Sequence, residues 1–371
     1  MNNVKRVLCI IGGMNAGGAE TFMMKVLRSI DRDKYMIDFA VAVKDKALYD
    51  DEILELGGVI YHLTPKTKGI ISFVKSVYHI VKDNGYKSVL RISQNSTSSI
   101  ELLIAKIAGA STVGLRSSNS DTCGGISERI GHKIFKPLAI MITNVKIAPS
   151  SCAAEFMFGK NCVKNNRVVL IKNGLDTEQY AYNEIGRNII RKELNISDET
   201  IVIGHIGRFN YQKNHKFLLE VFKEVYNKEP KSMLVLVGDG ELRQEVISYS
   251  ESLGINNRVT FLGIRSDIPN ILSAMDVFVL PSLFEGMPNT VIEAQTSGLP
   301  CVVSNSITPE VNITGNVKFL SLNEDKNKWA NMVLEHPIIN RKEMHKTMKN
   351  NGYDISDSVN VFVSKMFGET E

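Results

Sequence analysis

The sequence predicts an α/β protein built from two doubly wound parallel sheets. Short runs rich in Val, Ile and Leu alternate with segments of helical periodicity, which is typical of parallel strands buried by helices on both faces. The alternation pauses near residue 171 and restarts at residue 201. At 371 residues the chain is long enough for two domains of ordinary size.

The first half of the chain contains seven expected strands, the first of which ends at Gly12-Gly13. These strands are residues 4–11, 35–43, 59–63, 88–92, 112–116, 145–149 and 167–171. The expected helices between them are residues 19–30, 47–56, 70–84, 98–108, 126–141 and 151–158. Right-handed crossovers place the loops that follow the strands along one edge of the sheet, where ligands bind.

The second half repeats this organisation after a segment, residues 175–188, that we interpret as the connection between the domains. We expect strands at residues 201–206, 233–237, 258–262 and 277–280. We expect helices at residues 215–227, 241–253 and 267–274. The strands end in glycine-containing turns, which supports the chosen boundaries.

The stretch at residues 280–305 places two acids, Glu285 and Glu293, eight residues apart. Pro288 and Asn289 predict the start of a short helix, and Gly298 followed by Pro300 predicts its end. A helix start has free N–H groups and a positive dipole end, so it suits a phosphate. We therefore interpret the stretch as a site for a nucleotide-sugar. The alternative is an ordinary strand–loop–helix with two solvated acids.

Two further features point to phosphate. Arg208 and Lys213 lie in the loop after the strand at residues 201–206, at the same expected edge as Glu285, and two fixed cations suit a diphosphate. Residues 12–18 form a glycine-rich turn between a strand and a helix, but they match neither a Walker A motif nor a clean GxGxxG. A tight turn that binds no ligand is the alternative for that segment.

The net charge and the composition limit which kinds of partner the protein can have. The net charge of +4 is uneven: residues 1–178 have 24 Lys and Arg against 16 Asp and Glu, whereas residues 179–371 have 20 against 24. The basic half suggests an anionic partner, and no nucleic-acid motif is visible. Two basic, partly apolar segments, residues 66–87 and 128–139, are candidates for contact with an anionic membrane, although solvated helix faces are the commoner case.

Other signals argue against a metal site and a membrane span. The five cysteines are scattered without a CxxC pair, which fits a reducing, cytoplasmic setting. Asp31-Arg32-Asp33 is a DxD triplet, but it follows a helix at the edge opposite the ligand loops, and we interpret it as a surface turn. No apolar run approaches about 18 residues. We expect no metal and no cofactor beyond a nucleotide-sugar.

Three motifs resemble those of glycosyltransferase family 4. They are GGAE at residues 17–20, GRFNYQKN at residues 207–214, and E-x7-E from Glu285 to Glu293, of which the last is the most specific. The resemblance spans residues 4–365 and implies a GT-B fold: two Rossmann-like domains that face a central cleft, at residues 1–175 and 176–354. It also implies that the last segment, residues 355–371, packs back on the first domain.

The resemblance implies roles for individual residues. Glu285, Arg208 and Lys213 would act in catalysis, the two cations by stabilising the departing diphosphate and Glu285 by facing the donor sugar. Glu293 would bind the ribose hydroxyls. The full set of implied substrate-binding residues is Gly17, Gly18, Arg116, Ser118, Asn119, Asn173, Ile264, Gly286, Met287, Pro288, Asn289, Thr290, Val291 and Glu293.

The implied activity is retaining transfer of a hexose from a nucleoside-diphosphate sugar, UDP above all, to a lipid-linked glycan of a bacterial surface polysaccharide, at the inner face of the plasma membrane. One departure is that related members often have histidine in the loop that here begins Arg116-Ser117-Ser118-Asn119. The alternatives are a nucleotide-sugar epimerase, a NAD-dependent dehydrogenase, and an inactive subunit that binds a sugar nucleotide.

Overall fold

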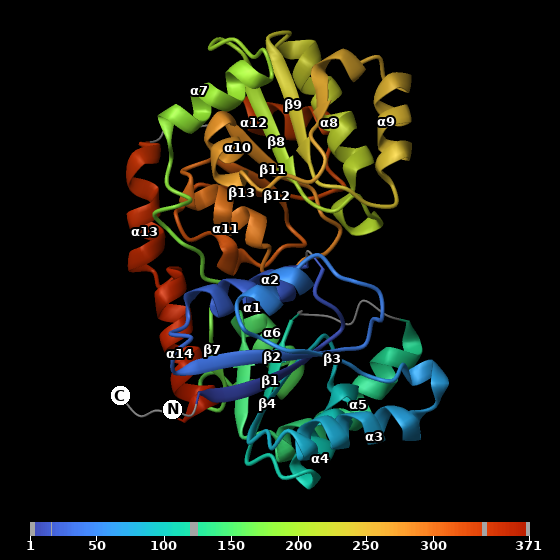
Figure 1. Cartoon of the computed structure of the whole chain (residues 1–371). Coiled ribbons are helices and arrows are strands. Elements are labelled where there is room, and N and C mark those ends of the chain that lie inside the picture. The colour runs from blue at the N-terminus through green and yellow to red at the C-terminus, as the bar shows by residue number, and fades with distance from the viewer. Residues whose placement is uncertain (1–3, 16, 119–124, 336–339, 369–371) are drawn as a thin grey trace. The chain divides into compact units, whose positions relative to one another are not determined.

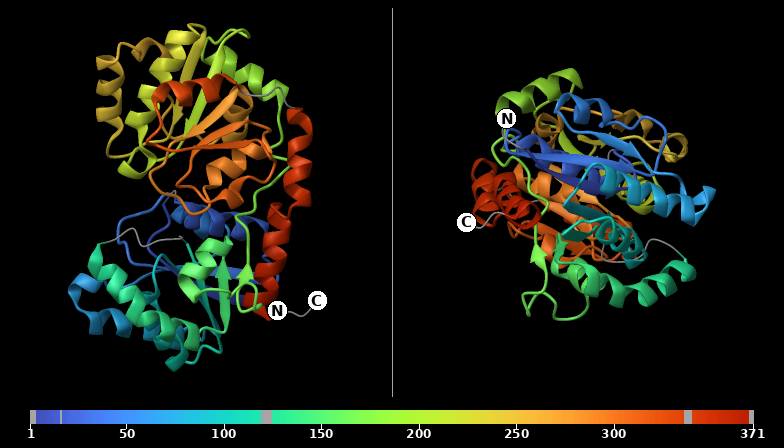
Figure 2. Two further views of the ribbon diagram at one scale, coloured as in Figure 1. Left: turned by 180° about the vertical axis from the view of Figure 1, so that it is seen from behind. Right: turned by 60° about the horizontal axis from the view of Figure 1, so that its bottom comes forward.

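The computed structural model describes residues 4–15, 17–118, 125–335 and 340–368. The chain divides into two compact units (Figure 1). Unit 1 comprises Met1–Gly174 and Gly352–Glu371, and unit 2 comprises Leu175–Asn351. Each unit is a parallel sheet with helices on both faces (Figure 2). The two doubly wound sheets expected from the sequence are therefore confirmed.

The sheet of unit 1 has the strand order β3-β2-β1-β4-β5-β6-β7. Its strands are β1 (Lys5–Ile11), β2 (Tyr35–Val41), β3 (Ile60–His62), β4 (Ser88–Ser93), β5 (Thr112–Ser117), β6 (Val145–Ala148) and β7 (Val169–Leu170). Its helices are α1 (Gly18–Ser29), α2 (Asp50–Glu55), α3 (Ile70–Asp83), α4 (Ser99–Ile107), α5 (Ile126–Ile142), α6 (Ser151–Phe158) and α14 (Ile355–Phe367), with short 3₁₀ turns η1 (Lys66–Lys68) and η2 (Ser96–Ser98).

Side-chain alternation along β1 explains how this sheet is covered on both faces. Val7, Cys9 and Ile11 face a core that includes α1 and α14, whereas Leu8 and Ile10 face a second core formed with α3, α4, α5 and α6. Helix α14 begins after an Asp354 cap, and its Phe362 and Met366 are buried in the first of these cores. The segment that ends the chain thus completes unit 1.

The sheet of unit 2 has the order β10-β9-β8-β11-β12-β13. Its strands are β8 (Ile201–Ile206), β9 (Ser232–Val237), β10 (Val259–Phe261), β11 (Val277–Leu280), β12 (Cys301–Ser304) and β13 (Val317–Leu320). Its helices are α7 (Glu184–Glu193), α8 (His215–Lys228), α9 (Arg243–Ser252), α10 (Ile268–Ala274), α11 (Asn289–Thr296), α12 (Lys326–Leu334) and α13 (Met344–Asn350). The 3₁₀ turns are η3 (Tyr211–Lys213), η4 (Asn256–Arg258), η5 (Pro309–Val311) and η6 (Arg341–Glu343).

The interpretation of residues 175–188 as a plain connection is wrong in its second part, because α7 begins at Glu184. The Asn183 side chain caps this helix by accepting hydrogen bonds from two of its backbone N–H groups. Several other predicted elements are shorter in the structure, such as α2, which begins at Asp50 rather than at residue 47. The strand expected at residues 167–171 is reduced to β7, two residues long.

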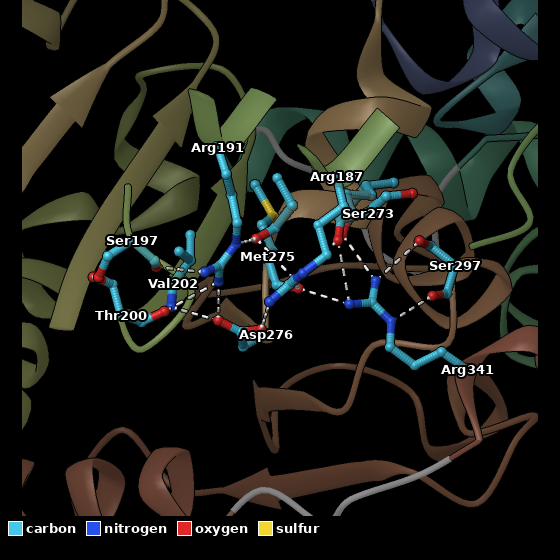
Figure 3. A network of polar contacts seen from close by, with 12 residues as sticks. Arg187, Arg191, Ser197, Thr200, Val202, Ser273, Met275, Asp276, Ser297 and Arg341 are labelled. Carbon is cyan, nitrogen blue, oxygen red and sulfur yellow. Dashed lines mark hydrogen bonds and ion pairs between the residues drawn. The ribbon is translucent and has the colours of Figure 1, made fainter. Parts of the chain in front are cut away.

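Three arginines tie the first and last segments of unit 2 to its sheet (Figure 3). Arg187 and Arg191 on α7 both pair with Asp276, at 2.8 and 2.7 Å. Arg341, in η6, donates to the Met275 carbonyl at 2.8 Å and to the Ser297 carbonyl at 3.0 Å. Helix ends leave carbonyls unpaired, so these guanidinium groups satisfy the ends of α10 and α11.

Candidate functional site

The loops after β8 and β11 lie side by side at the carboxyl edge of the unit 2 sheet. The backbone N–H of Leu283 donates to the Gln212 carbonyl, and the Gln212 side chain donates to the Phe284 carbonyl, both at 2.8 Å. The Asn214 side chain donates to the Pro281 carbonyl at 3.2 Å. Parallel strands end at one edge, so two sequence segments about 70 residues apart form one surface.

The loop after β9 packs against the loop after β8. The two backbones are so close that only glycine fits between them. A Cβ on Gly238 would lie 2.1 Å from the Gly207 carbonyl oxygen, and a Cβ on Gly240 would lie 2.5 Å from the Phe209 carbonyl oxygen. Gly238 also has φ of +129°, which side-chain-bearing residues rarely adopt. The sequence marked these glycines only as a strand end, and the close packing of two loops is what requires them.

Lys213 and Glu285 meet on this surface. The Lys213 Nζ lies 2.7 Å from Glu285 Oε1, and the side chains are only 15% and 12% exposed. The Ser282 hydroxyl donates to the same Glu285 oxygen at 3.2 Å. The Ser282 carbonyl accepts in turn from Ser306 at 2.8 Å, which fixes the loop that holds the acid. The structure thus brings together two of the three residues expected to act in catalysis.

Arg208, the third of these residues, lies on the rim. Its guanidinium is 3.3 Å from the Glu241 carboxylate, and the side chains are 68% and 56% exposed. Exposed pairs of this kind contribute little to stability. Arg208 can therefore release Glu241 and bind another anion at a small cost in free energy. Lys213, in contrast, is held in place by Glu285.

The start of α11 has groups that suit a phosphate. The helix begins at Asn289 after Pro288, and no side chain caps it. The Thr290 hydroxyl is buried and has no hydrogen-bond partner in the described part of the chain, so a donor and acceptor is available in the first turn. Glu293 is buried one turn later. Ile264, which follows Gly263 at φ of +66°, is exposed on the loop after β10.

Two buried histidines flank the loop after β8. His205 in β8 and His215 at the start of α8 are buried with their rings 4.7 Å apart, and His215 stacks on Phe209 at 4.1 Å. Burial, together with the positive charge of Lys213, lowers the pKa of His215 to about 4. Burial also lowers the pKa of His205 well below its ordinary value. Both rings are therefore neutral at physiological pH. No motif in the sequence predicts this pair.

Unit 1 brings two other predicted residues together. Arg116 in β5 donates to the Asn173 side chain at 2.5 Å, and its guanidinium lies 4.2 Å from the centre of the Phe22 ring. Burial lowers the pKa of Arg116 to about 10, so it remains charged at neutral pH. Ser118 follows β5 and is partly buried, whereas Asn119 lies outside the described residues.

The glycine-rich turn of unit 1 leads directly into α1. Gly17 is the residue before the helix, and Gly18 is its first residue. A Cβ on Gly17 would lie 2.2 Å from a carboxylate oxygen of Glu20, so the turn packs closely on its own helix. Burial raises the pKa of Glu20.

The described ranges hold neither a metal-binding cluster nor a helix that could span a membrane. No group of three or more His, Cys, Asp or Glu side chains there has the arrangement of a metal site. No helix in those ranges is long and apolar enough to cross a membrane.

Similar proteins are known. The family described as Glycosyl transferases group 1 matches residues 186–355. The putative glycosyltransferase EpsF of Bacillus subtilis (strain 168) is 33% identical over 367 residues, which are 97% of this chain and 96% of that protein. A UDP-Gal:alpha-D-GlcNAc-diphosphoundecaprenol alpha-1,3-galactosyltransferase of Escherichia coli is 32% identical over 235 residues, or 62% of this chain and 60% of that protein.

Solved structures share the fold. Anabaena Alr3699/HepE in complex with UDP superposes with a TM-score of 0.74 at 18% identity and covers 98% of this chain and 96% of its own. The same protein in complex with UDP-glucose gives a TM-score of 0.72 at 18% identity, with 97% and 95% covered. Since a relative is 33% identical along almost the whole chain, the protein belongs to the group 1 glycosyltransferases and has their GT-B fold.

Proposed function

We propose that the protein transfers a hexose, with retention of anomeric configuration, from a UDP-sugar to a lipid-linked glycan during synthesis of a bacterial surface polysaccharide. The names of its relatives support this: one is a galactosyltransferase that uses UDP-Gal and a diphosphoundecaprenol acceptor, and another is a Vi polysaccharide biosynthesis protein of Salmonella typhi. UDP and UDP-glucose complexes of a protein with the same fold support the choice of donor.

The Lys213–Glu285 pair is the observation on which the proposal rests. A lysine and an acid fixed 2.7 Å apart at the edge of a Rossmann-like sheet form a site with one cation for phosphate and one carboxylate for sugar. Next to it, the start of α11 offers the Thr290 hydroxyl. A diphosphate has the charge that Lys213 and Arg208 require, and the sugar attached to it presents hydroxyls to Glu285.

The chemistry needs stabilisation of a leaving group. The bond between the anomeric carbon and the diphosphate oxygen breaks, and the negative charge that develops is stabilised by Lys213, Arg208 and the positive end of α11. The acceptor hydroxyl forms its bond on the same face of the sugar, and its proton passes to an oxygen of the departing diphosphate. Glu285 positions the donor sugar, and Glu293 binds the ribose hydroxyls. Arg116, Ser118, Asn119 and Asn173 are assigned to the acceptor side.

The first test is Lys213→Ala. Loss of a charge-assisted contact of about 1.5–3 kcal/mol reduces sugar transfer roughly 10- to 150-fold. The matched control is Lys216→Ala, because Lys216 lies three residues further along the chain, in the first turn of α8, but pairs with Glu245 on the exposed surface. If both variants transfer sugar at the rate of the parent protein, the phosphate role of Lys213 is wrong. Glu285→Ala should abolish transfer and leave a folded protein.

The donor and the stereochemistry are tested separately. A thermal-shift screen across UDP-, GDP-, ADP- and dTDP-sugars should single out UDP, since a ligand at 100 times its dissociation constant adds about 2.7 kcal/mol of stability. The anomeric configuration of the product, followed by NMR, distinguishes retention from inversion. Incubation of the donor alone identifies an epimerase if an epimer appears.

We also propose that the reaction needs no metal, because the cations of the site are side chains. Chelation of divalent ions with EDTA should leave transfer unchanged, and loss of activity restored by Mg²⁺ would contradict this.

A further inference from the structure

Helix α5 exposes a row of large apolar side chains. Ile126 is 80% exposed, Ile130 53%, Ile134 65% and Met141 75%. The first three are four residues apart, so they lie along one face of the helix. The opposite face is buried, with His132, Ala139 and Ile142 in the unit. Isolated exposed apolar residues are ordinary, but a row that runs the length of a 17-residue helix marks a contact surface.

Cations flank this row. Arg129, Lys133 and Lys136 lie on the same helix, against a single acid, Glu128. Near the end of α5, an open hollow of about 540 Å³ is lined by Lys133, Lys136, Pro137, Ile140 and Met141. The lining of the hollow therefore combines apolar side chains with two lysines.

A second, smaller pocket adjoins the first through Ile140. It has a volume of about 240 Å³, and its lining includes Lys146, Lys160 and Arg167. None of these three cations forms an ion pair with a carboxylate within the described ranges, and the Lys146 amine donates only to the Thr143 carbonyl, at 2.7 Å. Burial lowers the pKa of Lys146, and the positive charges of Arg167 and Lys106 lower it further. A set of cations that repel one another at a pocket is typical of an anion site.

The acid next to this pocket has other partners. Glu155 accepts a hydrogen bond from the Asn161 backbone N–H at 3.2 Å, and Lys136 contacts the backbone carbonyl of Glu155 rather than its carboxylate. The other segment considered for membrane contact, residues 66–87, differs in this respect. Its Lys66 already pairs with the buried Glu101 at 2.9 Å.

We propose that the exposed face of α5, with the Lys146–Lys160–Arg167 pocket at its end, docks the protein on a bilayer that contains anionic phospholipid. The isoleucine row enters the boundary between headgroups and acyl chains, and the cations bind headgroup phosphates. A soluble phosphate compound would leave the apolar row unexplained, and a nucleic acid would too. The inference deepens the proposed use of a lipid-linked acceptor, since such an acceptor resides in a membrane.

Sedimentation with vesicles tests the proposal, using the full chain without donor or acceptor. The vesicles contain either phosphatidylcholine alone or equal parts of phosphatidylcholine and phosphatidylglycerol. We expect binding to the mixed vesicles only, with weaker binding at high salt. Lys146→Gln with Arg167→Gln should weaken binding by roughly 30-fold, since each cation near an anionic surface contributes about a 5-fold factor. Ile130→Ser with Ile134→Ser should weaken it at least about 10-fold.

Unit 2 offers a matched control. Ile185 and Ile189 on α7 are also four residues apart and are 72% and 56% exposed, so Ile185→Ser with Ile189→Ser removes the same apolar groups elsewhere. Lys192→Gln with Lys318→Gln is the charge control. Equal loss in test and control variants, or equal binding to both kinds of vesicle, would overturn the proposal.

Two other outcomes are also decisive. If the protein is a dimer in solution that Ile130→Ser with Ile134→Ser dissociates, and it does not bind vesicles, then the face is a protein interface. If vesicle binding is retained both in Ile130→Ser with Ile134→Ser and in Lys146→Gln with Arg167→Gln, then another surface docks. Because donor turnover is not measured here, failure of this proposal leaves the donor-site tests of Lys213 and Glu285 unaffected.

Discussion

Lowering the pH from 7 to 5 is expected to destabilise unit 2 through His215. This ring is buried against Phe209, and neither of its nitrogens has a hydrogen-bond partner in the described part of the chain. Its pKa is about 4 in the folded protein against 6.5 for the free side chain. The folded state therefore excludes the proton that the unfolded chain binds in this range.

The sign and size of the change in unfolding free energy follow from the difference between the pKa values of His215 in the folded and unfolded chain. Because the folded pKa is depressed, the contribution is complete above the unfolded pKa and stability is lost as the pH falls from about 6.5 toward 4. At pH 5 the difference in pKa corresponds to about 2 kcal/mol of unfolding free energy. His205 acts in the same direction, so the effect of His215 must be isolated by substitution.

The assay uses the one tryptophan of the chain. Trp329 is fully buried in unit 2 and makes an edge contact with Phe217, on the same helix as His215, with ring centres 5.3 Å apart. Its fluorescence during urea unfolding thus reports unit 2 alone, which avoids assuming that both units unfold together. In the parent protein the urea midpoint should fall between pH 7 and 5, and in His215→Phe it should fall by roughly 1 M less.

The comparison is between two pH-dependent changes, so a constant effect of the phenylalanine on packing cancels. His79→Gln, at an exposed position on α3, is the control and should behave as the parent protein. An equal loss of stability between pH 7 and 5 in the parent protein and in His215→Phe would refute the assignment of a buried, neutral His215.

Two other substitutions test features of unit 2. Asp276→Asn removes the carboxylate that pairs with both Arg187 and Arg191, and it should destabilise unit 2 by about 3–5 kcal/mol in the same fluorescence assay; a loss below about 1 kcal/mol would contradict the network. Gly238→Ala forces a Cβ against the Gly207 carbonyl and should weaken donor binding measured by calorimetry, whereas Gly254→Ala, where a Cβ meets nothing within 4 Å despite a similarly positive φ, should not.

Local pattern was enough to predict most of the architecture. The seven strands of unit 1 and β8 to β11 of unit 2 are expected from apolar runs, which parallel sheets bury on both faces. Strand β13 and helices α12 and α13 are not among the expected elements. Helix α7 was missed although Asn183 caps it and its isoleucines have helical spacing. Of its residues, Gly186, Ile190 and Arg191 are buried, and its anchoring depends on arginines that bind carbonyls. Ile185 and Ile189 are four residues apart but exposed, so the apolar pattern of α7 does not mark its buried face.

The candidate site was predictable as a set of residues but not as a set of contacts. The spacing of Glu285 and the position of Lys213 placed both at one sheet edge, yet nothing in the sequence shows that they pair with each other. The same holds for Arg208 and Glu241, which are 33 residues apart. The neutral state of His215 was equally inaccessible, because it depends on burial by residues distant in the chain.

The discontinuous composition of unit 1 has a consequence for synthesis on the ribosome. Unit 2, residues 175–351, emerges as one continuous segment and can fold as soon as it is made. Unit 1 cannot complete its core until the end of the chain is made, because Val359, Phe362 and Met366 belong to the core that covers one face of β1. Until α14 is translated, the part of that core that α14 covers stays exposed, while unit 2 is already complete. A nascent chain interrupted between these two moments would present its apolar surface to chaperones.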